Sequence, residues 1–252
     1  MDTNTSPGQI GSLDKAHVIT ALQEGEILLQ GQFLNSSNYT FLCDLLYAGE
    51  TLRVVYKPLR GEQPLWDFPV RTLTRREAAA YVVSEALGWN LVPPTVYRRR
   101  KAPLGAGSVQ LFMEHDPEYH YFRFSETDKQ RLRPVVLFDL LINNADRKGG
   151  HVLKDQTGHL WVIDHGVCFN VEPKLRTVIW DFTGEEIPET LLEDAARLAE
   201  DLETGGGTHL ALRPLLRVSE IRAVVRRARA LIAAGEFPAP DPGRRSYPWP
   251  PV

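Results

Sequence analysis

The stretch Leu140–Gly166, LLINNADRKGGHVLKDQTGHLWVIDHG, carries most of the information in this 252-residue sequence. It contains two acidic residues, Asp146 and Asp164, separated by the loop-like segment DRKGGH and a short apolar run that ends at Ile163. Asp, Asn and Gly are common in turns, so either acid alone is explained by an ordinary turn. The order of an apolar helix, an acid, a polar residue five positions on, a hairpin and a second acid indicates instead one composite site.

That order is the layout of a phosphotransfer site. In such a site one Asp accepts the proton of the acceptor hydroxyl, and a metal ligand follows five positions later. A second Asp, after a buried strand, holds Mg²⁺ against the ATP phosphates. Asp146, His151 and Asp164 stand at these three places. We therefore predict that Asp146 is the base and that His151 and Asp164 hold the metal.

Composition sets modest limits on the class of protein. An apolar content of 43% in 252 residues is enough for one large core or for two small lobes around a cleft. The net charge of −3, with the charges interspersed, disfavours nucleic-acid binding. Cys43 and Cys168 lie in strand-like runs, which indicates neither disulfides nor a zinc cluster. We find no signal region and no run of about 20 apolar residues, and expect a cytoplasmic protein without stable membrane anchoring.

The periodicity predicts a β-rich first half. A helix is expected at 14–23, followed by three strands with short connections, then a helix within 72–89 and two more strands. The predicted strands are 27–34, 39–47, 51–57, 96–99 and 108–113. This pattern indicates a five-stranded antiparallel lobe with one inserted helix.

The second half is predicted to be mainly helical. The run 128–144 reads as one buried helix that leads into the loop at Asp146, and helices follow at 188–202 and 219–234, the last with Ser219 as its cap. The proline-rich residues 237–252 are expected to lie extended over the surface or to be disordered. We predict an N-terminal lobe at 1–114, with 1–13 flexible, a C-terminal lobe at 115–236, and a tail at 237–252.

Dispersed residues add a resemblance to a known superfamily. They are Lys57 in VVYKP, Glu77 in RREAAAYVVSEALG, the segment VQLFMEH, Asn144-Ala145-Asp146-Arg147, and Asp164 in VIDHG. Over about residues 27–170 the chain resembles bacterial members of the atypical protein-kinase-like superfamily, nearest to phosphatidylinositol 3-/4-kinase-like and HipA-like kinases. The resemblance implies an α+β, two-lobed protein-kinase-like fold, with an antiparallel β-rich N-lobe and a mainly helical C-lobe.

The resemblance also implies roles for the basic residues. Lys57, at the end of a strand, would reach the α- and β-phosphates of ATP, although a surface lysine before proline would look the same. Glu77 would pair with Lys57, or it would complete a capping box with Thr74. Lys148 resembles the lysine that protein kinases direct at the γ-phosphate. Arg147 either neutralises the site or ties the loop to the lower lobe.

The remaining nucleotide contacts are predicted from position. The phosphate-covering loop falls at Asn35–Asn38, where turn amides with Ser36, Ser37 and Asn38 would hold phosphate without a glycine-rich motif. An ordinary polar hairpin turn would look the same. Leu111, Met113 and Glu114 would supply the apolar walls and backbone groups for adenine, as would any strand that ends at a linker.

His151 departs from the family pattern, which has Asn at that place. Magnesium prefers oxygen ligands, whereas imidazole suits manganese better. Either the metal preference shifts from Mg²⁺ toward Mn²⁺, or His151 makes a different contact. His165, beside Asp164, is expected to be a packed or hydrogen-bonded core residue. The basic cluster Arg98–Lys101 is expected to be a solvated hairpin rather than a site for a phosphorylated headgroup.

Together these observations predict an ATP-dependent kinase of the phosphatidylinositol 3-/4-kinase-like type. It would transfer the γ-phosphate to a hydroxyl of an unidentified acceptor, with ATP and Mg²⁺, or Mn²⁺, as cofactors. A lipid or inositol headgroup, a small metabolite and a protein Ser/Thr stay open as acceptors, the last as in HipA-like kinases. The alternatives are a catalytically weak nucleotide sensor, which the His151 departure and the glycine-poor loop support, and adenylyl transfer.

Overall fold

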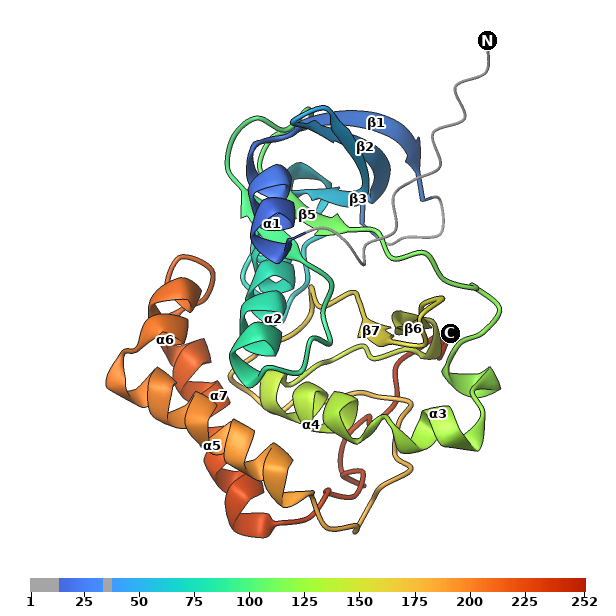
Figure 1. Cartoon of the computed structure of the whole chain (residues 1–252). Helices are drawn as coiled ribbons and strands as arrows, with labels where there is room; N and C mark the ends of the chain where they lie inside the picture. The colour runs from blue at the N-terminus through green and yellow to red at the C-terminus, as the bar shows by residue number, and fades with distance from the viewer. Residues whose placement is uncertain (1–13, 34–37) are drawn as a thin grey trace. The chain divides into compact units, whose positions relative to one another are not determined.

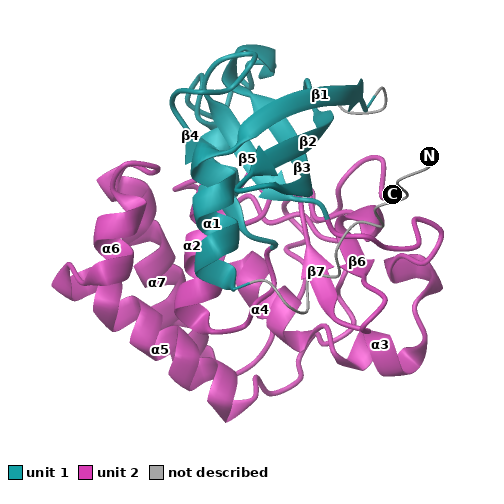
Figure 2. Cartoon of the chain, turned by 45° about the horizontal axis from the view of Figure 1, so that its top comes forward, with its two compact units in different colours: residues 1–78, 93–112 teal, residues 79–92, 113–252 magenta. Residues whose placement is uncertain are grey.

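The computed structural model of the chain describes residues 14–33 and 38–252. The chain forms two compact units, shown in different colours in Figure 2. Unit 1 comprises residues 1–78 and 93–112, and unit 2 comprises residues 79–92 and 113–252. The long helix α2, Leu73–Leu87, therefore begins in unit 1 and ends in unit 2. The predicted lobe boundaries at 114 and 236 stay a prediction.

A five-stranded antiparallel sheet is the main element of unit 1 (Figure 1). Its strands run in the order β1-β2-β3-β5-β4, so the first three form the predicted meander. Their bounds are β1 Glu26–Gln32, β2 Phe41–Tyr47, β3 Glu50–Pro58, β4 Thr95–Arg98 and β5 Gly107–Leu111. Alternate side chains of β2 and β3 are fully buried, because successive residues of a strand face opposite sides of the sheet. Helix α1, Lys15–Glu24, adds Val18, Ala21 and Leu22 to this core.

Close approach of β5 to β3 fixes the strand that carries Lys57. Lys57 pairs with Ser108, and Pro58 pairs with Gly107. A Cβ at Gly107 would lie 2.3 Å from the carbonyl oxygen of Lys57. Glycine is therefore required at position 107 by the approach of two backbones, not by an unusual φ angle.

Unit 2 is mainly helical, with one short hairpin. Its helices are α3 Glu126–Gln130, α4 Arg133–Ile142, α5 Glu189–Thr204, α6 Gly207–Leu212 and α7 Val218–Ala234. The hairpin consists of β6 Val152–Lys154 and β7 Leu160–Val162. Helix α7 packs against both α5 and α4 (Figure 1). Seven of the ten residues of α4 are buried, as the nearly continuous apolar run predicts for a central helix.

The α+β class, the five strands and the helix inserted between β3 and β4 confirm the prediction from the sequence. Two local predictions were wrong, and one helix was missed. The run 128–144 is split into α3 and α4, because Pro134 lies in the first turn of α4, where proline is favoured as a helix start. The N-cap residue of helix α7 is Arg217 and not Ser219, and the Arg217 amide donates to the Glu220 side chain. Helix α6 had not been predicted at all.

The proline-rich tail is part of unit 2. Phe237 is buried and packs against Phe182 at 5.8 Å between ring centroids. Ser246 is also buried, and its carbonyl oxygen accepts a hydrogen bond from the Thr177 amide at 3.1 Å. Of the two alternatives predicted for the tail, an extended segment packed on the surface describes these residues and a disordered one does not. Across the described ranges 14–33 and 38–252, we find no helix with the length and apolarity needed to span a bilayer.

Candidate active site

The β6–β7 hairpin brings His151 and Asp164 together across thirteen positions of sequence. Val152 pairs with Val162, so the residue before β6 lies opposite the residue after β7, and the Ile163 amide donates to the His151 carbonyl at 3.1 Å. Asp164 follows with a left-handed backbone, φ 62°, which is uncommon for a residue other than glycine. Its Oδ2 lies 3.4 Å from His151 Nε2.

The orientation of the His151 ring leaves Nε2 directed at this carboxylate. Nδ1 lies 3.0 Å from the carbonyl oxygen of Asp146, and a carbonyl oxygen can only accept, so Nδ1 carries the proton. The longer contact of 3.4 Å from the Lys148 amide to the same nitrogen is secondary. In the neutral ring the lone pair of Nε2 then faces a carboxylate oxygen. A cation between the two, either a proton or a metal ion, makes this arrangement favourable.

Asp146 and Lys148 lie at the other end of the same loop. The Lys148 ammonium is 3.5 Å from Asp146 Oδ2, and both side chains are only partly exposed. Burial raises the pKa of Asp146 to about 6, an effect that Lys148 opposes and that the nearby negative charge of Asp164 reinforces. A carboxylate with such a pKa is still mostly ionised at pH 7 and is a better proton acceptor than an ordinary aspartate.

A buried ion pair between Arg147 and Asp139 holds the loop on its inner side. Arg147 Nε and Nη2 lie 2.8 and 2.9 Å from the two carboxylate oxygens of Asp139, and both side chains are essentially inaccessible. Asp139 keeps Arg147 charged and raises its pKa against the opposing effect of burial. The Nη1 atom donates to the carbonyls of His151 and Ile163, at 3.2 and 2.9 Å. Arg147 thus ties the loop to helix α4, one of the two roles left open for it, and its charge also acts on Asp146 and Asp164.

Two asparagines complete this inner support. Asn144 donates from Nδ2 to Asp139 at 2.9 Å and accepts from the Asp146 amide at 3.0 Å, which fixes the backbone of Asp146. Asn143 ends α4 with a left-handed backbone. Its Nδ2 donates to the carbonyls of Asn170 and Glu172, and its Oδ1 accepts from the Lys174 amide. The pair therefore holds both the loop and the segment that follows Asp164.

Unit 1 contains the second cluster of predicted residues. Lys57 Nζ lies 2.5 Å from Glu77 Oε1, and Glu77 is almost fully buried. The amide and hydroxyl of Thr74 both donate to Glu62 at 2.8 Å. Of the two roles considered for Glu77, the structure therefore favours the pairing with Lys57 over the capping box.

The other predicted nucleotide contacts are less distinctive. Ser36 and Ser37 lie outside the described residues. Asn38 Oδ1 accepts from the Gln63 amide at 2.7 Å, so its side chain is used to fasten the β1–β2 connection. Leu111 and Met113 are buried, and Glu114 is exposed. The Met113 carbonyl already contacts His115 Nδ1 at 2.8 Å. Binding of nucleotide by these residues stays a prediction.

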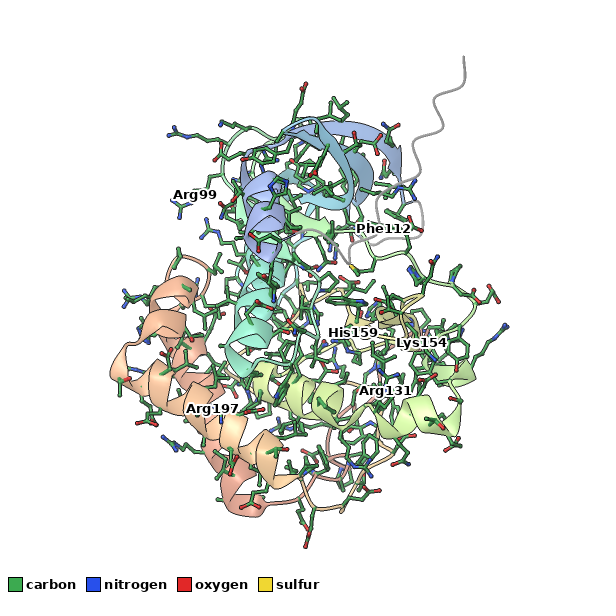
Figure 3. All side chains as sticks on the ribbon, viewed as in Figure 1. Arg99, Phe112, Arg131, Lys154, His159 and Arg197 are labelled. Atoms are coloured by element: carbon green, nitrogen blue, oxygen red, sulfur yellow. The ribbon has the colours of Figure 1, made fainter. Side chains whose placement is uncertain are left out.

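Two further predictions concern residues with a structural role. His165 is buried, as expected, with Nε2 2.8 Å from Arg147 Nη2 and its ring edge-on to Phe138. In the basic cluster, Arg98 is buried and donates to the Gly25 carbonyl at 2.9 Å, contrary to the expectation of a fully solvated hairpin. Arg99 does project outward from unit 1, as Figure 3 shows.

The donor set near His151 suits a divalent cation that is completed by other ligands. Among residues 14–33 and 38–252, no group of three or more His, Cys, Asp or Glu side chains is arranged to hold a metal. His151 Nε2 and Asp164 Oδ2 supply two donors at a spacing that one ion can bridge. Mg²⁺ in phosphotransfer sites takes one or two protein ligands and fills its shell with water and phosphate oxygens.

Asp139 and Asn143 were not recognised from the sequence. Asp139 is the only charged residue in the run Val135–Ile142, and an acid there must be paired to be buried. That isolated acid is the signal from which a support role could have been inferred. Its partner Arg147 was visible eight residues later, but only the fold shows that the two side chains meet.

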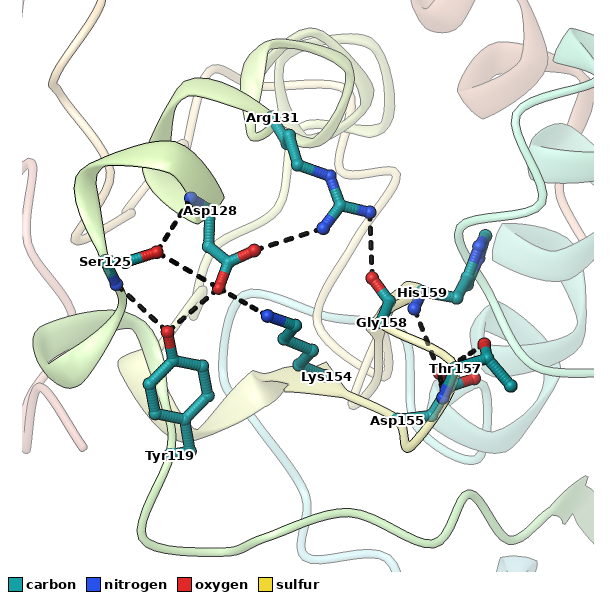
Figure 4. A network of polar contacts seen from close by, with 9 residues as sticks. All are labelled: Tyr119, Ser125, Asp128, Arg131, Lys154, Asp155, Thr157, Gly158 and His159. Atoms are coloured by element: carbon teal, nitrogen blue, oxygen red, sulfur yellow. Dashed lines mark hydrogen bonds and ion pairs between the residues drawn. The ribbon is translucent and has the colours of Figure 1, made fainter.

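A separate polar network supports the loop end of the hairpin (Figure 4). The buried carboxylate of Asp128 accepts from Lys154 at 2.7 Å, from the Tyr119 hydroxyl at 2.8 Å and from Arg131 at 3.1 Å. Arg131 also donates to the Gly158 carbonyl at the tip of the hairpin. The network thus joins α3 and the residue after it to the loop end of the β6–β7 hairpin, the element that positions His151 and Asp164.

Comparisons with known proteins bear on both the relationships of the chain and its fold. No family model matches it. Over 272 residues it is 39% identical to Protein Rv2133c from Mycobacterium tuberculosis (strain ATCC 25618 / H37Rv), and the match covers 94% of this chain and 95% of that protein. A shorter match, 31% identical over 117 residues, is to phosphatidylinositol 4-kinase gamma 4 from Arabidopsis thaliana and covers 37% of this chain and 21% of that protein.

Solved structures show the fold. The Golgi casein kinase with Mn/ADP bound superposes with a TM-score of 0.56 at 15% identity, covering 94% of this chain and 80% of that one. The Helicobacter pylori proinflammatory kinase CtkA superposes with a TM-score of 0.53 at 12% identity, covering 86% and 94%. The chain therefore has an α+β, protein-kinase-like fold, as the sequence predicts. The phosphatidylinositol 3-/4-kinase-like and HipA-like types stay predictions.

Proposed function

The chain belongs to the family of the Mycobacterium tuberculosis protein Rv2133c, and we propose that it is an ATP-dependent kinase. It would transfer the γ-phosphate of ATP to a hydroxyl of an acceptor that is not identified. The kinase folds of the Golgi casein kinase and of CtkA support phosphotransfer in general. The observation that carries the proposal is the set of Asp146, Lys148, His151 and Asp164, which unit 2 assembles around one loop and one hairpin.

Each residue of this set suits one task in phosphotransfer. Asp146, partly exposed and with a pKa of about 6, would orient the acceptor hydroxyl and take its proton. Lys148 would place its ammonium against the transferred phosphate, where it offsets the charge of the equatorial oxygens. The distance of 3.5 Å to Asp146 also keeps the two groups within reach of one reacting centre.

His151 and Asp164 would hold the divalent cation. When bound, that cation neutralises negative charge on the nucleotide phosphates. The protein's own part is to fix the two donors: Arg147 bonds to the carbonyls at both ends of the hairpin, and the Asp146 carbonyl holds the imidazole so that Nε2 is the donor nitrogen. An imidazole ligand favours Mn²⁺ over Mg²⁺ relative to the asparagine of the family pattern.

Unit 1 would position the nucleotide through Lys57 and Glu77. The 2.5 Å contact and the burial of Glu77 hold the ammonium of Lys57 in one place on β3. In kinases this ion pair directs the lysine at the α- and β-phosphates. We further propose the phosphatidylinositol 3-/4-kinase-like type, a cytoplasmic location, and an acceptor that is a lipid or inositol headgroup, a metabolite, or a protein Ser/Thr.

One observation favours a second function, a nucleotide sensor without efficient transfer. His151 replaces the asparagine of the family pattern and already has a carboxylate partner in Asp164. An ion pair between a protonated His151 and Asp164 would occupy the metal position. Binding of nucleotide without turnover would then be the outcome.

Radiolabelled ATP distinguishes these functions. The chain is incubated with [γ-³²P]ATP, with Mg²⁺ or Mn²⁺, and in turn with phosphoinositide vesicles, a mixture of hydroxylated metabolites, and Ser/Thr peptides. Asp146→Asn is the test variant and Glu193→Gln, an exposed change on α5, is the matched control. Loss of a general base lowers transfer by about 10²- to 10⁴-fold in Asp146→Asn only.

The other outcomes are equally specific. Transfer that is equal in Asp146→Asn and in the control would refute the role of Asp146. A shift of the melting temperature by ATP, with no label moved to any acceptor, to water or to the protein, identifies the sensor. Label that moves from [α-³²P]ATP but not from [γ-³²P]ATP identifies adenylyl transfer.

A further inference from the structure

The loop Asp146–His151, the proposed catalytic loop, contains Gly149 and Gly150, and both approach the C-terminal tail. Gly149 lies between the tail and the ring of Phe122. The Gly149 amide donates to the carbonyl oxygen of Pro251 at 2.8 Å. A Cβ at Gly149 would lie 2.7 Å from the ring of Phe122, and a Cβ at Gly150 would be 3.9 Å from a methyl group of Val252. Neither glycine has a positive φ angle. Glycine is thus needed at 149 for close approach, and not only for a tight bend.

The tail is fastened at a second place, on the segment that follows Asp164. The Thr177 amide donates to the carbonyl of Ser246 at 3.1 Å. Thr177 forms a parallel β-bridge with Arg147. In it, the Arg147 amide donates to the Arg176 carbonyl, and the Arg147 carbonyl accepts from the Val178 amide. The loop, the following segment and the tail are therefore joined side by side by backbone hydrogen bonds.

Side-chain contacts hold the tail against these segments. Arg244 donates to the Pro173 carbonyl at 3.0 Å, and Tyr247 lies edge-on to Trp180 with 6.4 Å between ring centroids. Three of the last five residues are proline. Proline restricts φ, so this segment loses less conformational entropy when it is fixed than a chain without proline would. The tail can therefore hold the loop through few contacts.

We propose that the segment Ser246–Val252 is a positioning element of the catalytic loop. It fixes the turn Gly149–His151 from outside, while Arg147 fixes the loop from inside. Lys148 and His151 flank the Gly149–Gly150 pair, which is the part of the loop with the greatest backbone freedom. Holding Gly149 restricts both side chains. The tail acts through these residues and leaves Asp146 and Lys148 partly exposed.

This inference rests on the proposed phosphotransfer only for its effect on rate, so the experiment has a first part that needs no catalysis. Exchange of the Gly149 amide hydrogen is measured by ¹H–¹⁵N NMR in the full chain and in a variant that lacks residues 249–252. Loss of one hydrogen bond, about 0.5–1.5 kcal/mol, is expected to speed exchange by about 2- to 12-fold. Leu210→Ala, a change at a side chain of α6 that is 68% exposed, is the matched control and leaves exchange unchanged.

The second part separates positioning from general stability. In the variant that lacks residues 249–252, kcat for transfer falls while KM for ATP stays within about twofold, because Lys57 and Glu77 are untouched. The melting temperature of each variant is recorded. If the deletion prevents folding, the full-length variant Pro250→Gly/Pro251→Gly keeps the carbonyl and removes the φ restraint, and it should show the same changes at smaller size.

Two results would overturn the proposal. One is Gly149 exchange that is the same with and without residues 249–252. The other is faster exchange with an unaltered kcat, which would make the tail a purely structural strap. If no form of the chain transfers phosphate, the proposed function fails, and the exchange measurement still decides whether the tail holds the loop.

Discussion

Removal of one partner of the Arg147–Asp139 ion pair should lower the free energy of unfolding more than replacement of both partners by apolar residues. Arg147→Met leaves the carboxylate of Asp139 buried, with the side chain of Asn144 as a remaining donor. Asp139→Leu leaves a guanidinium among carbonyl groups. Breaking a buried pair in this way costs about 3–5 kcal/mol, a large part of a total stability of about 5–15 kcal/mol.

The double variant should recover part of this loss. In Asp139→Leu/Arg147→Met no charge stays buried without its partner, and apolar side chains of similar volume fill the space. The bonds from Arg147 to His151 and Ile163 are lost in any case. We therefore expect the double variant to be less stable than the parent but more stable than either single variant, so its cost lies at least about 3 kcal/mol below the sum of the two single effects.

Urea denaturation provides the assay. Unfolding is followed by far-ultraviolet circular dichroism and by tryptophan fluorescence, and free energies are compared only where the two transitions coincide. Arg229→Met is the matched control, because Arg229 pairs with Glu203 at 2.5 Å in the same unit with both side chains more than 40% exposed. Its loss should leave the free energy of unfolding close to that of the parent, because an exposed ion pair contributes little.

The reasoning has two points of failure. If Arg147→Met costs no more than the exposed control, burial does not make this pair important. If the loss of stability in the double variant equals the sum of the two single losses within about 0.5 kcal/mol, the two side chains act independently. The inner support of the loop by this ion pair is then wrong.

Three other predictions concern separate parts of the molecule. Gly107→Ala forces a Cβ to within 2.3 Å of the backbone of β3, so it should lower the stability by about 1–3 kcal/mol in thermal unfolding and raise KM for ATP. Gly31→Ala, where the added Cβ has nothing within 4 Å, should change neither quantity. Burial raises the pKa of Asp128, but its hydrogen bonds outweigh burial and hold that pKa below its usual range, so its contribution to stability is present above about pH 4 and is lost as pH falls further. The stability gap between the parent and Asp128→Asn in urea should therefore close on acidification, while a gap that is constant from pH 7 to pH 3 would contradict the sign. His151→Asn should keep or raise Mg²⁺-dependent transfer and lose the preference for Mn²⁺, measured as the ratio of the two rates. Loss of all nucleotide hydrolysis and transfer in this variant, with its fold intact, would refute the hypothesis that His151 lines the metal pocket and is replaceable there by Asn.

Much of unit 1 was predictable from local patterns. Its strands are short runs rich in apolar residues, and short turns such as Ala48-Gly49 join neighbours, so an antiparallel meander follows from the sequence alone. The helix inserted between β3 and β4 has a clear helical period. Helix α6, only six residues long, offers no such period, and it forms next to α5 through tertiary packing.

The site residues show where local reasoning ends. Asp146 and Asp164 were predicted as site residues from their spacing, because a loop and a hairpin of that length occur in phosphotransfer sites. The choice between the two roles of Glu77 was not available from the sequence. A glutamate three residues after a threonine satisfies the capping pattern equally well, and the decision came from Glu62, twelve residues before Thr74, which takes the amide and the hydroxyl of that threonine.

The sequence by itself determined the fold class and the order of the chemical groups along the chain. Both depend on periodicity and on spacing, which are local properties. Tertiary structure alone decided which groups meet: Arg147 with Asp139, His151 with Asp164, and Gly149 with a carbonyl about one hundred residues further on. These contacts depend on the register of a hairpin and on the path of a proline-rich tail, and hydrogen bonds between distant backbones leave no pattern in the residues that make them.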